Sequence, residues 1–76
     1  MTSDKYLNRE NYSEIGKEVF DRLKKIWDQE DFLICTMSNL KTEKSLQKML
    51  DFLIKTGTTD SDDVIPYGIA IRKGLV

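Results

Sequence analysis

The clearest helical pattern of the chain lies in residues 46–54, with the sequence LQKMLDFLI. The apolar positions i, i+3, i+4, i+7 and i+8 are occupied by Leu46, Met49, Leu50, Leu53 and Ile54. This spacing places all of these side chains on one side of an α-helix. We therefore predict a helix from about Thr42 to Thr56, which Gly57 ends in a left-handed conformation.

A second apolar stripe precedes this helix in the sequence, with spacings of three and four residues. It consists of Tyr12, Ile15, Val19, Leu23 and Ile26, and it is widened by Phe20 and Trp27. The stripe predicts a helix over residues 12–28, with Asn11 as its N-cap. Gly16 weakens this helix, but its lack of a side chain would permit the close approach of another element.

Charged side chains four residues apart support the same helix. Glu18 with Arg22 and Asp21 with Lys25 are favourable pairs, and each such pair stabilises a helix by ~0.2–0.5 kcal/mol.

Two further segments are ambiguous between helix and strand. Residues 32–37 contain types that favour a strand, although Asp31 could cap a short helix there. Residues 67–72 alternate with the period of a strand. The carboxylates at 62–63 instead suit the start of a helix, with Thr59, Asp60 or Ser61 as its cap, whereas Pro66 opposes a helix unless it falls within the first turn.

These patterns predict a mainly α fold, a small bundle-like domain of three or four helices. The alternative is an α+β fold with two short strands at about residues 32–37 and 67–72. A two-stranded parallel sheet is a weak unit on its own. We therefore favour the helical fold.

The chain has 76 residues, which suffices for one small domain with a thin core. We assign the polar residues 1–9 to a frayed segment and residues 10–76 to a single globular domain. A partner or a second copy would add to the stability of so small a core.

The composition argues against catalysis. The chain has no histidine and one cysteine, Cys35. The commonest general base and metal ligand is therefore missing, and Cys35 is expected to be a buried core residue because it lies in an apolar run. Asp60, Asp62 and Asp63 are not followed by the remaining ligands of a calcium loop. We expect a protein that is not an enzyme and that has no cofactor and no metal.

Two features suggest where the protein acts. A free thiol suits a reducing compartment, and residues 1–5 lead into no apolar stretch that would mark a signal peptide. The apolar run from Phe32 to Cys35 is too short to span a bilayer. We expect a cytoplasmic protein that does not enter a membrane.

Two kinds of side chain are candidates for binding a partner. Trp27 and Phe52 are aromatic residues of the type that anchors protein interfaces, although both also fit an apolar core. Lys41, Lys44 and Lys48 lie on one side of the helix at 42–56 and, with residues 72–73, could contact phosphates. The net charge of −1 provides no overall basic field, and the carboxylates at 62–63 would repel DNA.

The predicted function is a non-catalytic protein–protein interaction or structural module that binds a protein partner or a second copy. The alternative is a small regulatory nucleic-acid-binding protein that uses the lysine-lined helix.

Overall fold

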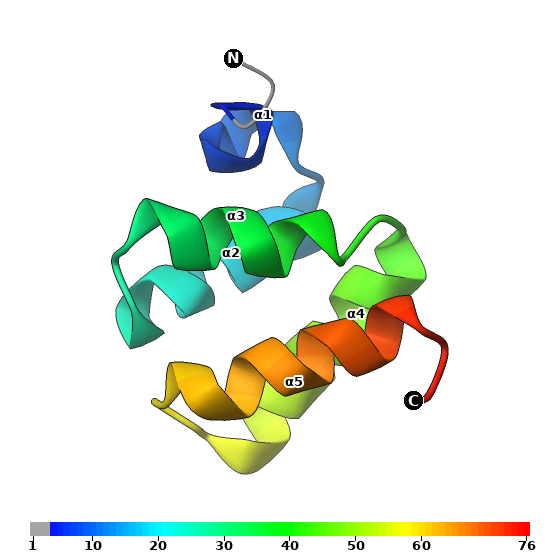
Figure 1. Ribbon diagram of the computed structural model, residues 1–76. Helices are drawn as coiled ribbons and strands as arrows, with labels where there is room; N and C mark the ends of the chain where they lie inside the picture. The colour runs from blue at the N-terminus through cyan, green and yellow to red at the C-terminus, as the bar shows by residue number, and fades with distance from the viewer. Residues whose placement is uncertain (1–3) are drawn as a thin grey trace.

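The computed structural model describes residues 4–76 of the chain. Its elements are α1 (Asp4–Leu7), the 3-10 turn η1 (Arg9–Asn11), α2 (Glu14–Ile26), α3 (Glu30–Ser38), α4 (Glu43–Thr56) and α5 (Ser61–Arg72). Over residues 4–76 there is no strand (Figure 1). The prediction of a mainly α, bundle-like domain is therefore confirmed, and the α+β alternative is excluded.

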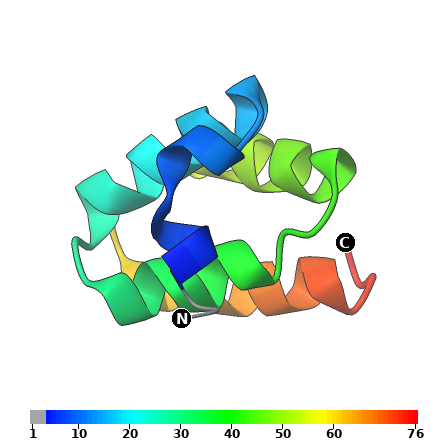
Figure 2. The same ribbon diagram turned by 90° about the horizontal axis from the view of Figure 1, so that it is seen from above.

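The helices form two layers. α2 packs against α4 in one layer, and α3 packs against α5 in the other (Figures 1 and 2). The hydroxyl of Ser13, just before α2, donates a hydrogen bond to Glu43 at the start of α4, at 3.0 Å. Hence α2 and α4 begin at the same end of the molecule. α3 and α5 begin together at the opposite end and run back (Figure 1).

The two ambiguous segments are helical because only a helix buries their apolar side chains together. Phe32, Leu33 and Met37 of α3 are buried, as are Val64 and Ile71 of α5. In a strand, neighbouring residues such as Phe32 and Leu33 point to opposite faces. Only one of the two could then have reached this core.

The core lies between the layers and is supplied by α2, α3, α4 and α5. Its buried apolar residues are Val19, Phe20, Leu23, Phe32, Leu33, Met37, Leu40, Leu46, Met49, Leu50, Leu53, Val64 and Ile71. The two stripes recognised in the sequence thus supply about half of it, and α3, α5 and Leu40, two residues after α3, supply the rest.

Three residues expected on buried faces are exposed: Trp27, which is 44% exposed, Cys35 and Ile54. Cys35 is exposed, so its assignment to the core was wrong. Its neighbours Phe32 and Thr36 occupy the inward side of α3, which turns Cys35 outward. Ile54 is 57% exposed. Position i+8 is rotated by ~80° from position i around a helix, so Ile54 lies at the edge of the stripe.

The start of α2 differs from its prediction. The helix covers Glu14–Ile26 rather than residues 12–28, and its N-cap is Ser13, whose hydroxyl accepts a hydrogen bond from the backbone N–H of Gly16 at 3.3 Å. Asn11 instead ends η1. A Cβ on Gly16 would lie 2.8 Å from Cβ of Tyr12. The nearest atoms at Gly16 therefore belong to Tyr12, in the turn before α2, and not to another helix as expected.

The ends of α4 agree with the sequence. Thr42 is its N-cap and accepts a hydrogen bond from the backbone N–H of Ser45 at 3.1 Å. Gly57 follows the helix with φ 61° and ψ 21°, a left-handed conformation that glycine adopts at little cost.

α5 contains an internal proline. Asp60 caps the helix by accepting a hydrogen bond from the N–H of Asp62 at 2.9 Å. Pro66 lies inside the helix, beyond its first turn. The sequence argument that Pro66 opposes a helix there was wrong, because Pro66 is exposed and the burial of the opposite side of α5 outweighs one lost hydrogen bond.

The segment predicted to fray has helical turns where the structure describes it. Residues 1–3 lie outside the described residues, and residues 4–9 contain α1 and the start of η1. α1 packs against α3, and the hydroxyl of Tyr12 donates to the carbonyl oxygen of Tyr6 at 2.7 Å. Fraying is a matter of mobility and stays a prediction.

Candidate interaction site

The two aromatic candidates lie in different environments. Trp27 follows the last residue of α2 and is 44% exposed, so its ring is available for a contact. Phe52 is half-buried and stacks on Tyr67 of α5, with ring centroids 4.0 Å apart and an interplanar angle of 13°. Phe52 therefore contributes to packing between α4 and α5.

The lysine candidates lie at the end of the molecule where α4 begins and α5 ends (Figure 1). Lys41 and Lys44 are exposed. Lys48 is half-buried, and its ammonium donates a hydrogen bond to the backbone oxygen of Val76 at 2.6 Å. Glu43 lies among them, so the positive charge at this end is interrupted.

A hollow of about 460 Å³ lies between the N-terminal turns and the turn from α3 to α4. Its lining residues are Lys5, Tyr6, Asn11, Tyr12, Ser13, Met37, Leu40, Lys41, Thr42, Glu43 and Leu46. Four of its lining residues are paired with one another, because Tyr12 donates to Tyr6 and Ser13 donates to Glu43. Burial raises the pKa of Tyr12 to about 12, so this phenol is no base at neutral pH.

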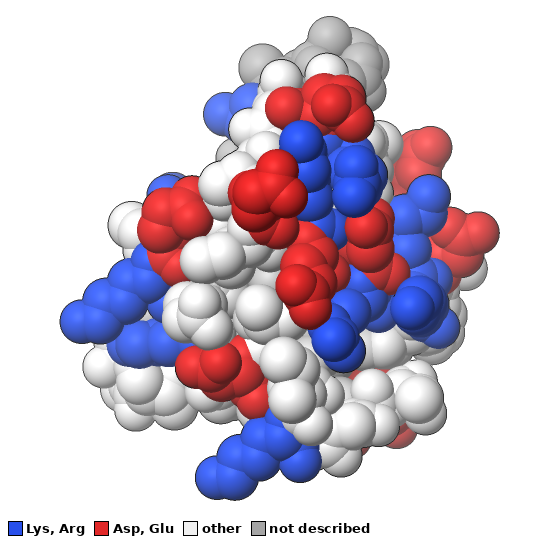
Figure 3. Space-filling view, turned by 180° about the vertical axis from the view of Figure 1, so that it is seen from behind, with Lys and Arg blue, Asp and Glu red and all other residues white. Residues whose placement is uncertain are grey.

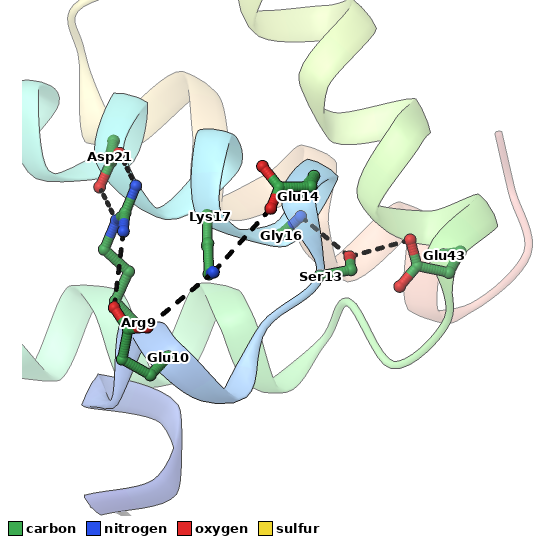
Figure 4. A network of polar contacts seen from close by, with 8 residues as sticks. All are labelled: Arg9, Glu10, Ser13, Glu14, Gly16, Lys17, Asp21 and Glu43. Atoms are coloured by element: carbon green, nitrogen blue, oxygen red, sulfur yellow. Dashed lines mark hydrogen bonds and ion pairs between the residues drawn. The ribbon is translucent and has the colours of Figure 1, made fainter.

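The face over α2 and α4 is densely charged. Basic and acidic side chains lie side by side over it (Figure 3). Figure 4 shows the part of this network around the start of α2, where Arg9 pairs with Asp21, and Lys17 lies 4.0 Å from both Glu10 and Glu14. Each of these basic groups has an acidic neighbour, so the part of the face around the start of α2 has no excess of positive or negative charge.

The outer side of the other layer has a different character. Its half-buried and exposed side chains between the helix ends are uncharged: Ile34, Cys35 and Ser38 of α3, and Ile65, Pro66 and Ile69 of α5. We call this surface the α3–α5 face. No helix lies in front of it in Figure 1, since α1 packs on the side of α3 away from α5.

Sequence reasoning missed the α3–α5 face, although a signal for it was present. Charged residues make up 33% of the chain, yet residues 32–40 and 64–71 contain none. Neither run alone predicts a surface, because uncharged runs also form cores. The surface follows only once both runs are known to be helical and adjacent.

Comparison with protein-family models, with curated proteins and with solved structures gave no match to this chain. Among the described residues, no group of three or more histidine, cysteine, aspartate or glutamate side chains is placed to hold a metal ion. No helix within residues 4–76 has the length and apolar character needed to cross a membrane.

Proposed function

We propose that this protein is a non-catalytic protein-interaction module that contacts its partner through the α3–α5 face. The observation that supports the proposal is the uncharged character of that face in a highly charged chain. Cys35 and Pro66 of this face are exposed and its other side chains are half-buried, and an uncharged centre with a polar rim is typical of protein interfaces. A non-catalytic role agrees with the absence of histidine from the sequence.

A cytoplasmic location is part of the proposal. Cys35 is a free cysteine with an exposed thiol, and such thiols persist in reducing compartments.

The exposed thiol also provides the experiment. A photoreactive maleimide is attached to Cys35, the one cysteine of the chain, and the labelled protein is irradiated in an extract of cells that express it. We expect a discrete covalent adduct with a protein. An excess of unlabelled protein should abolish the adduct, because a specific surface is saturable.

Matched variants show whether the α3–α5 face makes the contact with the partner. Pro66→Lys adds a charge to the middle of the face, whereas Pro66→Ala removes the same ring without adding charge. Unlabelled Pro66→Ala should compete for the partner and Pro66→Lys should not. A label on Lys55→Cys in a Cys35→Ser background, at the end of α4 in the other layer, is the positional control. An equal yield from both positions, or no adduct from Cys35, would contradict the proposal.

Nucleic-acid binding is a second candidate, favoured by the clustering of basic residues at the end where α4 begins. Lys41, Lys44, Arg72 and Lys73 are exposed there. Binding to phosphates would fall steeply with salt. Filter binding at low salt tests this candidate: retention that Lys41→Gln with Lys44→Gln abolishes would support it, and no retention would remove it.

A further inference from the structure

We infer that the partner of the α3–α5 face is a second copy of this chain, paired about a two-fold axis that lies in the interface and runs perpendicular to α3 and α5. This inference rests on the proposed function, because it names the partner of the same face. It is carried by the charges at the two ends of the face.

Both helices of the face begin with acidic residues, and α5 is followed by a basic residue. On α5, Asp62 lies in the first turn and Lys73 follows the last residue; we call these two residues the α5 pair. On α3, Asp31 lies in the first turn, and the last turn carries no basic residue. Asp31, Asp62 and Lys73 are exposed. Since α3 and α5 run in the same direction, both acidic groups lie at one end of the face and Lys73 lies at the other.

Only one way of pairing two such faces brings opposite charges together. A two-fold axis parallel to the helices would place acidic ends on acidic ends. An axis in the interface and perpendicular to the helices makes α3 antiparallel to α3 of the second copy, and α5 antiparallel to α5. Asp62 of each copy then meets Lys73 of the other, and helix ends of opposite dipole sign face each other.

The α5 pair fixes the position of the axis. To bring Asp62 against Lys73 of the second copy, the axis must cross α5 midway between these residues, which falls between Tyr67 and Gly68. A Cβ placed on Gly68 would lie 3.9 Å from Cγ2 of Thr36. The axis therefore passes close to Thr36 of α3.

The charged residues at the helix ends also have a simpler function. Acidic groups at helix starts and basic groups at helix ends stabilise each helix through its dipole. That effect does not require the middle of both helices to be free of charge on the outer side. The uncharged middle is what a second copy would bury.

The size of the face indicates how the contact is built. α3 and α5 have 9 and 12 residues, which corresponds to lengths of ~14 and ~18 Å. Their uncharged middle covers only part of the ~800 Å² that each partner contributes to an interface of standard size. The charged ends must complete the contact, so the dimer should weaken as salt is added.

Sedimentation velocity of the purified protein is the first test. We expect a concentration-dependent dimer in the micromolar range at low salt. Asp62→Lys should weaken dimerisation by about tenfold or more, since two symmetry-related contacts change from attraction to repulsion. Lys73→Asp should do the same. The double variant Asp62→Lys, Lys73→Asp restores both attractions in antiparallel pairing and should recover the dimer.

Other outcomes overturn the inference. A wild-type protein that stays monomeric up to millimolar concentration has no second copy as its partner. A dimer that neither single reversal weakens uses another surface. If the singles weaken the dimer and the double variant does not recover it, the antiparallel geometry is wrong. Circular dichroism of each variant confirms that it is folded.

Crosslinking of Cys35 provides a measurement that needs no charge variant. Cys35 is the neighbour of Thr36, which lies against Gly68, so the two thiols of an antiparallel dimer lie near the axis. A short bis-maleimide should convert the wild type to a covalent dimer on a denaturing gel. The Cys35→Ser, Lys55→Cys protein should give no such band, because Lys55 lies in the last turn of α4, in the other layer. Equal yields from the two proteins would also overturn the inference.

The outcomes also separate this inference from the proposed function. A monomeric wild type whose labelled Cys35 gives a competable adduct with a different protein removes the second copy as the partner and leaves the interaction module in place. A monomeric wild type that gives no such adduct would contradict both the second copy as the partner and the proposed interaction module.

Discussion

Arg9 and Asp21 form a two-point ion pair across the turn between η1 and α2. Nε of Arg9 lies 2.9 Å from Oδ1 of Asp21, and Nη2 lies 3.0 Å from Oδ2 (Figure 4). The sequence pattern had predicted Lys25 as the partner of Asp21, but the bidentate guanidinium holds the carboxylate instead. The pair connects the N-terminal segment to the first long helix.

This ion pair should be visible in an acid titration. The hydrogen bonds from Arg9 hold the pKa of the Asp21 carboxyl below its usual value. A carboxyl with a lowered folded-state pKa stabilises the fold above its unfolded-state pKa, and this stabilisation is lost as the pH falls through the folded value. Arg9→Gln should therefore raise the pKa of Asp21, measured by NMR of the side-chain carboxyl.

The control is Arg22→Gln. Arg22 pairs with Glu18 at 3.1 Å, as the sequence predicted, and its removal should leave the Asp21 titration unchanged. Because Arg9 and Asp21 are both substantially exposed, with side-chain exposures of 45% and 47%, the effect of Arg9→Gln on stability should be small. An unchanged pKa of Asp21 in Arg9→Gln would contradict the geometry.

The two glycines within helices should respond oppositely to alanine. A Cβ on Gly16 would lie 2.8 Å from Cβ of Tyr12, which is too close, whereas a Cβ on Gly68 would lie 3.6 Å from the flexible Cε of Met49. Gly68→Ala should stabilise the protein by up to ~1 kcal/mol, because alanine favours the helix. Gly16→Ala should destabilise it by ~1–3 kcal/mol, since overpacking displaces Tyr12.

Urea unfolding compares these two variants directly. Displacement of Tyr12 also breaks its hydrogen bond to Tyr6, so residues 6–12 should lose protection from hydrogen exchange in Gly16→Ala only. A stabilised Gly16→Ala protein would show that Tyr12 does not pack over α2.

Tyr12 should control stability at high pH. Burial raises its pKa to about 12, from the ordinary phenol value of 10.0. Between these values the unfolded chain loses the phenolic proton while the folded chain keeps it, so stability falls as the pH rises from about 10 to about 12. Tyr12→Phe has no proton to lose and should show a smaller fall over this range.

Chemical unfolding at several alkaline pH values measures this dependence. Near neutral pH, Tyr12→Phe should be ~1 kcal/mol less stable than wild type, because the hydrogen bond to Tyr6 is absent. Identical alkaline slopes for the two proteins would contradict the buried position of the phenol.

Charges introduced on α4 should distinguish its buried side from its edge. Leu50 is 8% exposed and Ile54 is 57% exposed. Leu50→Asp should unfold the domain, because it buries an unpaired charge. Ile54→Asp places the same charge in solvent and should leave the protein folded. Circular dichroism separates the two, and a folded Leu50→Asp protein would show that the core has been assigned to the wrong side of the helix.

Shortening single side chains on the buried side of α4 tests the same assignment with a smaller change. Leu46 and Leu53 are each 5% exposed, so Leu46→Ala and Leu53→Ala should each cost ~2–5 kcal/mol. Urea unfolding measures the loss, and Ile54→Ala should cost much less.

α4 could be predicted closely from the sequence because its pattern is long and its ends carry their own signals. Five apolar residues at helical spacing over residues 46–54 favour a helix over a strand, and Gly57 marks the end. α3 could not be predicted in this way. Residues 32–37 form a short apolar run, and whether it is helix or strand is decided by which face meets α2 and α5, a tertiary contact absent from local sequence.

Contacts between residues that are distant in the sequence also limited how much of the candidate site could be predicted. The partners of Asp21 and Phe52 were missed because Arg9 lies 12 residues from Asp21 in the chain, and Tyr67 lies on another helix. The α3–α5 face was missed for a related reason. Its residues carry no charge in the sequence, but their exposure follows from the packing of both helices against the other layer.

Replacing Pro66 should measure how far tertiary packing overrides local preference. Pro66 lacks an N–H, so the carbonyl of Asp62 receives no helical hydrogen bond from it. A proline inside a helix costs ~3 kcal/mol relative to alanine, part of which is offset because proline also restricts the unfolded chain. Pro66→Ala should therefore raise the free energy of unfolding by ~1–2 kcal/mol.

The comparison is made by urea unfolding at low protein concentration, where association does not contribute. Pro66→Gly is the matched control and should be ~1 kcal/mol less stable than Pro66→Ala, since glycine has the lower helix propensity. If both variants were less stable than wild type, the proline ring would be supporting the fold at residue 66, and the backbone from Asp62 to Pro66 would not be the regular helix described above.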